Sequence, residues 1–137
     1  MEKKQKVDEA RPAFIKVSES IEGVINGIQC GYAVYVADKK EGEKYFNYFI
    51  PSFNMHFFAE TEEDGKIIGE AGIEGFFDYW VKNQGKKAFF DQIKKLGFVE
   101  VKSKAKKAVR YSAIRPSIPM AYNHKAFDIS TTISEAA

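Results

Sequence analysis

The sequence predicts an α+β fold, in which a small antiparallel sheet (a three-stranded meander plus a later strand) packs against one or two helices. Residues 32–59 hold three short runs rich in aromatic and β-branched side chains, with turn-like segments between them. Residues 62–96 instead repeat apolar side chains at intervals of three and four, as amphipathic helices do. With 137 residues, the chain has the usual size of one domain.

The three expected strands follow one another closely. The first is 32–37, and a charged, turn-like segment containing Gly42 closes it. The second is 44–50, and Pro51 ends it because proline has no N–H for a central ladder. The third is 55–59. Short turns between consecutive strands favour antiparallel pairing, so we expect a meander.

A helix is predicted over residues 62–81. Thr61 is a capping residue, and the acids that follow it suit the positive end of the helix dipole. Four glycines at intervals of three and four oppose a helix, and Asp64-Gly65 also suits a hairpin turn, so 62–75 remains open to both interpretations. We favour the helix, because glycines at this spacing give a flat face that can lie close against a sheet.

The N-terminal part of the domain is predicted to be helical somewhere within 12–28. The competing interpretation is a short strand over 14–17 followed by a helix that begins at Ser18. The helix is favoured by gaps of three and four residues between many of the apolar side chains, namely Phe14, Val17, Ile21, Val24, Ile25 and Ile28.

A second helix over 86–96 is predicted after the first, with Gly97 as its C-terminal stop. Residues 98–101 then form the later strand. The C-terminal residues are punctuated by proline and end in a Ser/Thr-rich stretch. The expected organisation is a charged leader at 1–11, a single α+β domain at 12–113, and an extended or partly disordered tail at 114–137.

The composition of the chain indicates which cellular compartment to expect. No apolar run is long enough to span a bilayer, and the N-terminus has no apolar segment of the signal-peptide type. Cys30 is the single cysteine, so an intramolecular disulfide framework is excluded. We therefore expect a cytoplasmic protein.

No familiar catalytic or cofactor-binding motif occurs in the sequence. The acids between 60 and 78 are interpreted as helix capping and solubility rather than as metal ligands. Cys30 and His56 could form a nucleophile–base pair only if they met, and packing is the commoner role of such a cysteine. We therefore expect no enzyme, cofactor or metal site. The enzymatic alternative is a metal-dependent nuclease.

Binding is the remaining role, and two features favour it. In the second strand Tyr45, Asn47 and Phe49 share one face, which can stack on bases, be covered by a second chain, or be buried. Residues 1–84 carry a net charge of −5 and residues 85–137 a net charge of +7, which suits a nucleic-acid contact, association of two copies, or a solvated face. The candidate binding surface is Tyr45, Asn47, Phe49, Lys86, Lys87, Lys94, Lys95, Lys102, Lys104, Lys106, Lys107 and Arg110.

Residues 31–83 resemble the HicB-like antitoxin family. The resemblance lies in the order of strand, hairpin and strand, a turn centred on Pro51, a third strand, a short polar cap ending in Thr61, and an acid-led helix. It implies a partial RNase H-like β-β-β-α fold that dimerises and neutralises a small RNA-cleaving toxin. The family often carries a DNA-binding segment, but the tail of this chain has no helix-turn-helix or ribbon-helix-helix pattern.

The sequence therefore predicts a non-catalytic, HicB-like binding module that binds a partner protein or RNA and forms a homo-oligomer, most simply a dimer. The alternative is a self-assembling protein–protein interaction module of phage or mobile-element type, with no nucleic-acid role.

Overall fold

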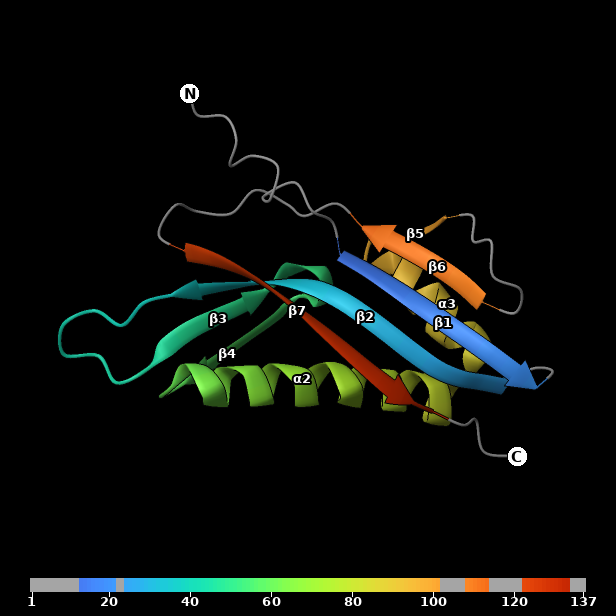
Figure 1. Cartoon of the computed structure of the whole chain (residues 1–137), viewed down its shortest axis with the longest axis horizontal. Coiled ribbons are helices and arrows are strands. Elements are labelled where there is room, and N and C mark those ends of the chain that lie inside the picture. Colours follow the sequence, from blue (N-terminus) through green and yellow to red (C-terminus); the bar gives the residue numbers. More distant parts are fainter. Residues whose placement is uncertain (1–12, 22–23, 102–107, 114–121, 134–137) are drawn as a thin grey trace, which may run out of the picture.

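The part of the chain that the structure describes folds into an antiparallel sheet of seven strands with two helices against it, which confirms the α+β class (Figure 1). The computed structural model describes residues 13–21, 24–101, 108–113 and 122–133. The strands are β1 (Ala13–Ile21), β2 (Val24–Ala37), β3 (Phe46–Ile50), β4 (Met55–Ala59), β5 (Val99–Val101), β6 (Ala108–Ala113) and β7 (Tyr122–Thr132). The helices are α2 (Glu62–Asp78), which continues into the π-helix η2 (Tyr79–Gln84), and α3 (Lys86–Lys95), while the 3-10 turn η1 (Pro51–Phe53) joins β3 to β4.

The sheet is organised around β2, its longest strand. The order along the sheet is β4-β3-β2-β1-β6-β5, and β7 also pairs with β2. Residues 28–31 of β2 pair with both β1 and β7, whereas residues 35–37 pair with both β3 and β7. Because a strand has only two edges, β7 follows one edge of β2, and β1 and β3 share the other. The predicted meander is confirmed in β2, β3 and β4, which pair antiparallel in sequence order.

The predicted helix within 12–28 is wrong, because this segment forms a hairpin of β1 and β2. The hairpin contains a bulge: Ser18 pairs with Gly27 but Glu19 pairs with Ile25, which leaves Asn26 as an extra residue. The bulge lets Ile25 and Ile28, three residues apart, both point into the core, where they are 0% and 2% exposed. A bulged strand therefore produced the spacing that is typical of a helix.

Helix α2 settles the choice between helix and hairpin over 62–75. Thr61 caps it, since the Asp64 N–H donates to Thr61 Oγ1 over 3.0 Å. Gly65 and Gly69 supply the expected flat face: a Cβ at Gly65 would overlap the Tyr48 ring, and one at Gly69 would lie 3.2 Å from Phe57 Cζ.

The other two glycines of α2 lie beside that flat face rather than in it, with Gly72 at its margin, where a Cβ would lie 3.4 Å from Met55 Sδ. Gly72 and Gly75 are exposed, and a Cβ at Gly75 would meet nothing within 4 Å. The flat-face prediction therefore holds for only two of the four glycines.

Aromatic rings join the helices to the sheet. Phe77 packs against Phe89 with a centroid distance of 5.9 Å, which ties α3 to the end of α2. Phe90 of α3 lies 5.8 Å from Tyr111 of β6. Phe77 and Phe89 are completely buried, and burial of each such ring stabilises the fold by about 2–3 kcal/mol. As predicted, Gly97 ends α3 with a positive φ of 99°.

The segment expected to be a tail beyond the domain supplies strand β7. Its residues pair with β2 from Gly27 to Ala37, and the Ile133 N–H donates to Asn26 O over 3.1 Å. Ile129 and Ile133 are buried in the core. In the described part of the chain, no helix has the length and apolar character to cross a membrane.

Candidate functional site

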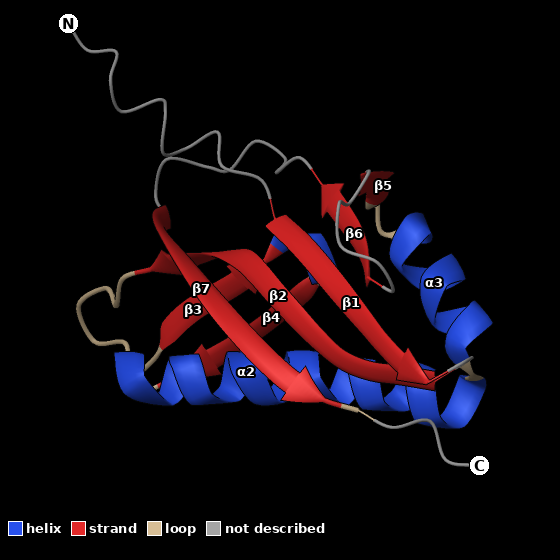
Figure 2. Cartoon of the chain, turned by 45° about the vertical axis from the view of Figure 1, so that its right-hand side comes forward, coloured by secondary structure: helices blue, strands red, loops and turns tan. Residues whose placement is uncertain are grey.

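The two faces of the sheet differ in their cover. Both helices pack on one face, called here the inner face, where α2 covers Tyr48 and α3 covers Tyr111. The side chains that alternate with these form the outer face, and none of the helices described lies on it (Figure 2). Among the described elements, only strands therefore form the outer face.

The centre of the outer face is closed. Ala33 and Tyr35 of β2 belong to this face by alternation, yet they are only 4% and 6% exposed. The accessible residues of the outer face therefore divide into two groups, one over β1, β2, β6 and β7 and the other over the β3–β4 hairpin.

The first group combines an aromatic ring, cations and hydrogen-bonding side chains. Lys16 of β1 lies between its register partners Arg110 on β6 and Gln29 on β2. The guanidinium carbon of Arg110 lies 5.3 Å from the centroid of the Phe14 ring, a cation–π contact. We call this group the Lys16 patch, and its residues are Phe14, Lys16, Ser18, Gln29, Arg110 and Ser130.

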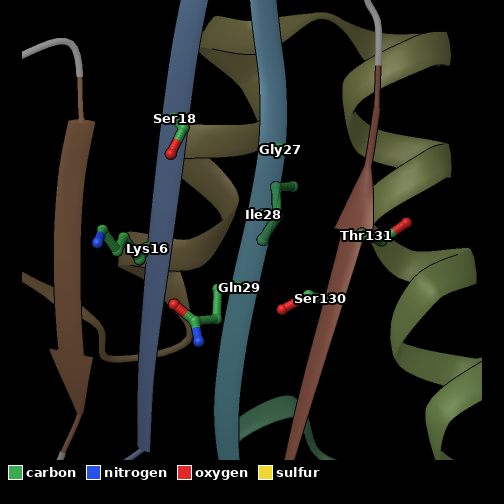
Figure 3. A pocket seen from close by; sticks show the side chains of 7 residues that line it. All are labelled: Lys16, Ser18, Gly27, Ile28, Gln29, Ser130 and Thr131. Atoms are coloured by element: carbon green, nitrogen blue, oxygen red, sulfur yellow. The ribbon is translucent and has the colours of Figure 1, made fainter.

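A pocket of about 300 Å³ opens within the Lys16 patch. Its lining includes Lys16, Ser18, Gln29 and Ser130, and Figure 3 shows the hydroxyl and amide groups that these side chains offer. The side chain of Thr131 points away from the others, toward α2, in the same view. The pocket therefore has a mixed lining, in which one ammonium group, one amide and two hydroxyls stand beside Gly27 and Ile28.

The Phe14 ring packs over Gly31 of β2, where a side chain would displace it. A Cβ at Gly31, its register partner, would overlap the Phe14 ring and come within 2.8 Å of Asp128 Oδ1. The ring and the carboxylate therefore lie over the Gly31 backbone. The carboxylate of Asp128 therefore lies close to Phe14 and partly offsets the positive charge of Lys16 and Arg110.

The second group lies on the β3–β4 hairpin. Phe49 and His56 are register partners, and their rings stack at 4.3 Å with an interplanar angle of 12°. Phe58 is 63% exposed, and its ring lies 6.4 Å from that of Tyr45. Tyr45, Asn47 and Phe49 are exposed or half-buried, whereas Tyr48 and Ile50 are buried under α2, as the alternation predicted.

The structure does not bring the candidate surface residues together. Asn47 and Phe49 lie on β3, with Tyr45 just before it, and β3 pairs with residues 35–37 of β2. Arg110 lies on β6, which is joined through β1 to residues 24–31 of β2. Lys86, Lys87, Lys94 and Lys95 belong to α3, on the inner side of the sheet, where Lys87 pairs with Asp91 at 3.3 Å. Four candidates lie outside the described residues: Lys102, Lys104, Lys106 and Lys107.

Sequence reasoning missed the centre of the Lys16 patch. Phe14, Lys16 and Ser18 alternate with the buried Ile15 and Val17, which is the period of a strand. The helical interpretation of this segment concealed that alternation.

The structure also places the residues considered for catalysis. Cys30 is completely buried on the inner face, and burial, with a smaller contribution from Asp128, raises the pKa of its thiol. His56 is exposed on the outer face, so it does not meet Cys30. Among the described residues, no three His, Cys, Asp or Glu side chains are grouped closely enough to hold a metal ion. The side chains of the Lys16 patch can stack, form hydrogen bonds and attract a negative charge.

Comparison of the chain with models of protein families, with curated proteins and with solved structures finds no match.

Proposed function

We propose that this chain is a non-catalytic binding module that holds single-stranded RNA on its Lys16 patch. The observation that supports the proposal most is the combination of Phe14, Lys16 and Arg110 on neighbouring strands of a sheet face that no described helix covers. Residues paired in register across antiparallel strands have Cβ atoms about 5 Å apart, so the two cations and the ring are within reach of one short stretch of nucleotides.

Each group of the patch matches a part of single-stranded RNA. Unstacked bases stack on aromatic rings and on guanidinium planes, which Phe14 and Arg110 supply. The Lys16 ammonium suits a phosphate. Hydroxyl and amide groups around the pocket suit base edges and the 2′-hydroxyl, which distinguishes RNA from DNA.

The distribution of charge also supports this face as the RNA-binding side. The acids in the first turn of α2 lie with that helix on the inner side of the sheet. The outer side presents Lys16 and Arg110, with Asp128 as the nearby acid. A polyanion therefore meets less repulsion over the Lys16 patch than over the first turn of α2, although α3 also carries lysines on the inner side.

Fluorescence anisotropy with a labelled single-stranded RNA of mixed sequence tests the proposal. Binding should weaken steeply as salt rises, because phosphate contacts release counterions. Replacing both Lys16 and Arg110 by alanine should weaken binding about tenfold at low salt and flatten the salt slope by about 0.7, because Lys16 is the phosphate contact and Arg110 stacks on a base. Replacing Lys94 and Lys95 of α3 removes the same charge from the inner side and should leave binding nearly unchanged.

Three results would contradict the proposal. Absence of RNA binding, or an affinity that does not change with salt, excludes RNA on this face. Equal losses for the two double variants indicate net charge rather than the patch. Shortening of the RNA during incubation with Mg²⁺ would indicate a nuclease instead of a binding module.

The alternative partner is a protein, as the resemblance of residues 31–83 to HicB-like antitoxins implies. In that case the partner is a small RNA-cleaving toxin. Capture of such a toxin, with no loss of capture when Lys16 and Arg110 are replaced, would favour this alternative.

A further inference from the structure

Strand β4 ends the sheet with an unprotected edge. Among the described residues no strand pairs with its second edge. Its sequence, Met-His-Phe-Phe-Ala, has no proline or side chain with a full charge, and its five register pairs with β3 follow without a bulge. Natural edge strands usually carry such features, because a bare edge invites another strand.

The other end of the sheet provides a contrast. Strand β5 has only three residues, and Glu100 stands at its centre. A short edge strand with a central charge is a poor template for pairing. The free edges of β4 and β5 therefore differ in what they can accept, and the remaining edge strand among the described residues, β7, carries the charged Asp128.

We propose that β4 pairs antiparallel with β4 of a second copy of this chain, about a two-fold axis at Phe57. In this register Met55 faces the partner's Ala59, and His56 faces the partner's Phe58. A two-fold axis brings each group near its own copy, so a charged group close to the axis would meet a like charge. The uncharged sequence of β4 suits a second copy better than it suits a charged peptide.

The charges beside β4 are neutralised within one copy. Glu60, which follows the strand, forms an ion pair of 3.0 Å with Lys44. The hydrogen bond from Lys44 to Glu60 raises the pKa of the lysine. Neither residue therefore brings an unpaired charge to the proposed contact.

Aromatic side chains on the outer face would gain cover from this pairing. Phe58 is 63% exposed, the second-largest exposure among the large hydrophobic residues described. His56 already stacks on Phe49. The pairing places Phe58 beside the partner's His56, and aromatic cross-strand pairs contribute about 0.2–1 kcal/mol each.

From Ile68 to Tyr79, the side of α2 and η2 next to β4 is also uncharged. A Cβ at Gly72 would lie 3.4 Å from Met55 Sδ, which places this side of the helix at the sheet edge. Ile68 and Tyr79, at helical spacing from Gly72, are 42% and 48% exposed. We call Ile68, Gly72, Gly75 and Tyr79 the edge stripe. Pairing of the β4 strands brings the two edge stripes together, and no like charges of the two stripes repel each other.

The oligomeric state of the full chain tests the proposal. Light scattering coupled to size-exclusion chromatography should give twice the 15.5 kDa mass of the chain. Phe58→Lys should convert this dimer to a monomer, because it places a lysine on each side of the axis. The matched control is Val99→Lys on β5, where Val99 is 66% exposed, and this variant should remain dimeric.

A second pair of variants tests the edge stripe. Ile68→Lys should weaken the dimer at least tenfold, whereas Ile67→Lys should not. Ile67 is 57% exposed and is the same residue type one position away, but it lies outside the edge stripe. Circular dichroism at the same concentration confirms that each variant is folded.

Two outcomes would overturn the proposal. One is a monomeric wild-type chain throughout the micromolar range. The other is a dimer that survives both Phe58→Lys and Ile68→Lys while these variants stay folded, because it must then use another surface. The result does not depend on RNA binding, since none of the four substitutions lies in the Lys16 patch.

Discussion

At the scale of single residues, Tyr48 shows a conflict between packing and hydrogen bonding. Its ring stacks on Phe57 at 4.9 Å and lies directly against Gly65 of α2. Its hydroxyl is buried and has no hydrogen-bond partner among the described residues. The ring therefore stabilises the contact between α2 and the sheet, while the hydroxyl lowers that gain.

Replacing Tyr48 by phenylalanine should raise the free energy of unfolding by about 1 kcal/mol, because a buried polar group without a partner costs about 1–3 kcal/mol. Urea denaturation followed by circular dichroism measures this change. Tyr45→Phe is the control, since the exposed Tyr45 side chain should change stability by less than about 0.5 kcal/mol. A loss of stability in Tyr48→Phe would show that the hydroxyl is hydrogen-bonded.

At the scale of elements, the close contact of α2 with β3 depends on Gly65. A methyl group there would overlap the Tyr48 ring, so Gly65→Ala should lower the free energy of unfolding by about 1–3 kcal/mol despite its better helix propensity. Gly75→Ala should instead raise stability by up to about 1 kcal/mol, because nothing lies within 4 Å of the added methyl. Both are measured by urea denaturation in a Phe58→Lys background, so that pairing of copies does not contribute. Equal effects of the two substitutions would contradict this account of α2.

The elements that were predicted correctly are those whose pattern is local. Strand β4 begins at Met55 and ends at Ala59 as expected, and Thr61 caps α2. For β1, a strand over 14–17 was the competing interpretation, but the sequence favours a helix because the bulge at Asn26 of β2 gives the second half of the hairpin a spacing typical of a helix. Strand β7 was missed because its partner β2 lies far away in sequence, and no local pattern reports that pairing.

The same limit applies to the candidate site. The face shared by Tyr45 and Phe49 followed from alternation within one strand. The Lys16 patch joins β1, β2, β6 and β7, so only the topology of the sheet brings its residues together.

At the scale of the whole molecule, burial sets how stability depends on pH. Burial is the largest cause that raises the pKa of the Cys30 thiol and of the Tyr32, Tyr48 and Tyr111 hydroxyls. Each group is therefore protonated in the folded chain at a pH where the unfolded chain has begun to lose that proton. The folded state binds more protons than the unfolded state in alkaline solution, so stability must fall as pH rises.

The free energy of unfolding should therefore be constant from pH 7 to about pH 8.5 and decrease above the ordinary pKa values of 9.0 for the thiol and 10.0 for the tyrosines. Ionisation of the Cys30 thiol in the unfolded chain should alone lower the free energy of unfolding by about 1.4 kcal/mol for each pH unit above 9.0. Urea denaturation at fixed protein concentration from pH 7 to pH 11 measures the slope. In Cys30→Ala, stability should begin to fall near pH 10.0, the ordinary pKa of tyrosine, rather than near pH 9.0, that of the thiol. A stability that stays constant or increases between pH 9 and pH 11 would show that these groups ionise as readily in the folded chain as in the unfolded one.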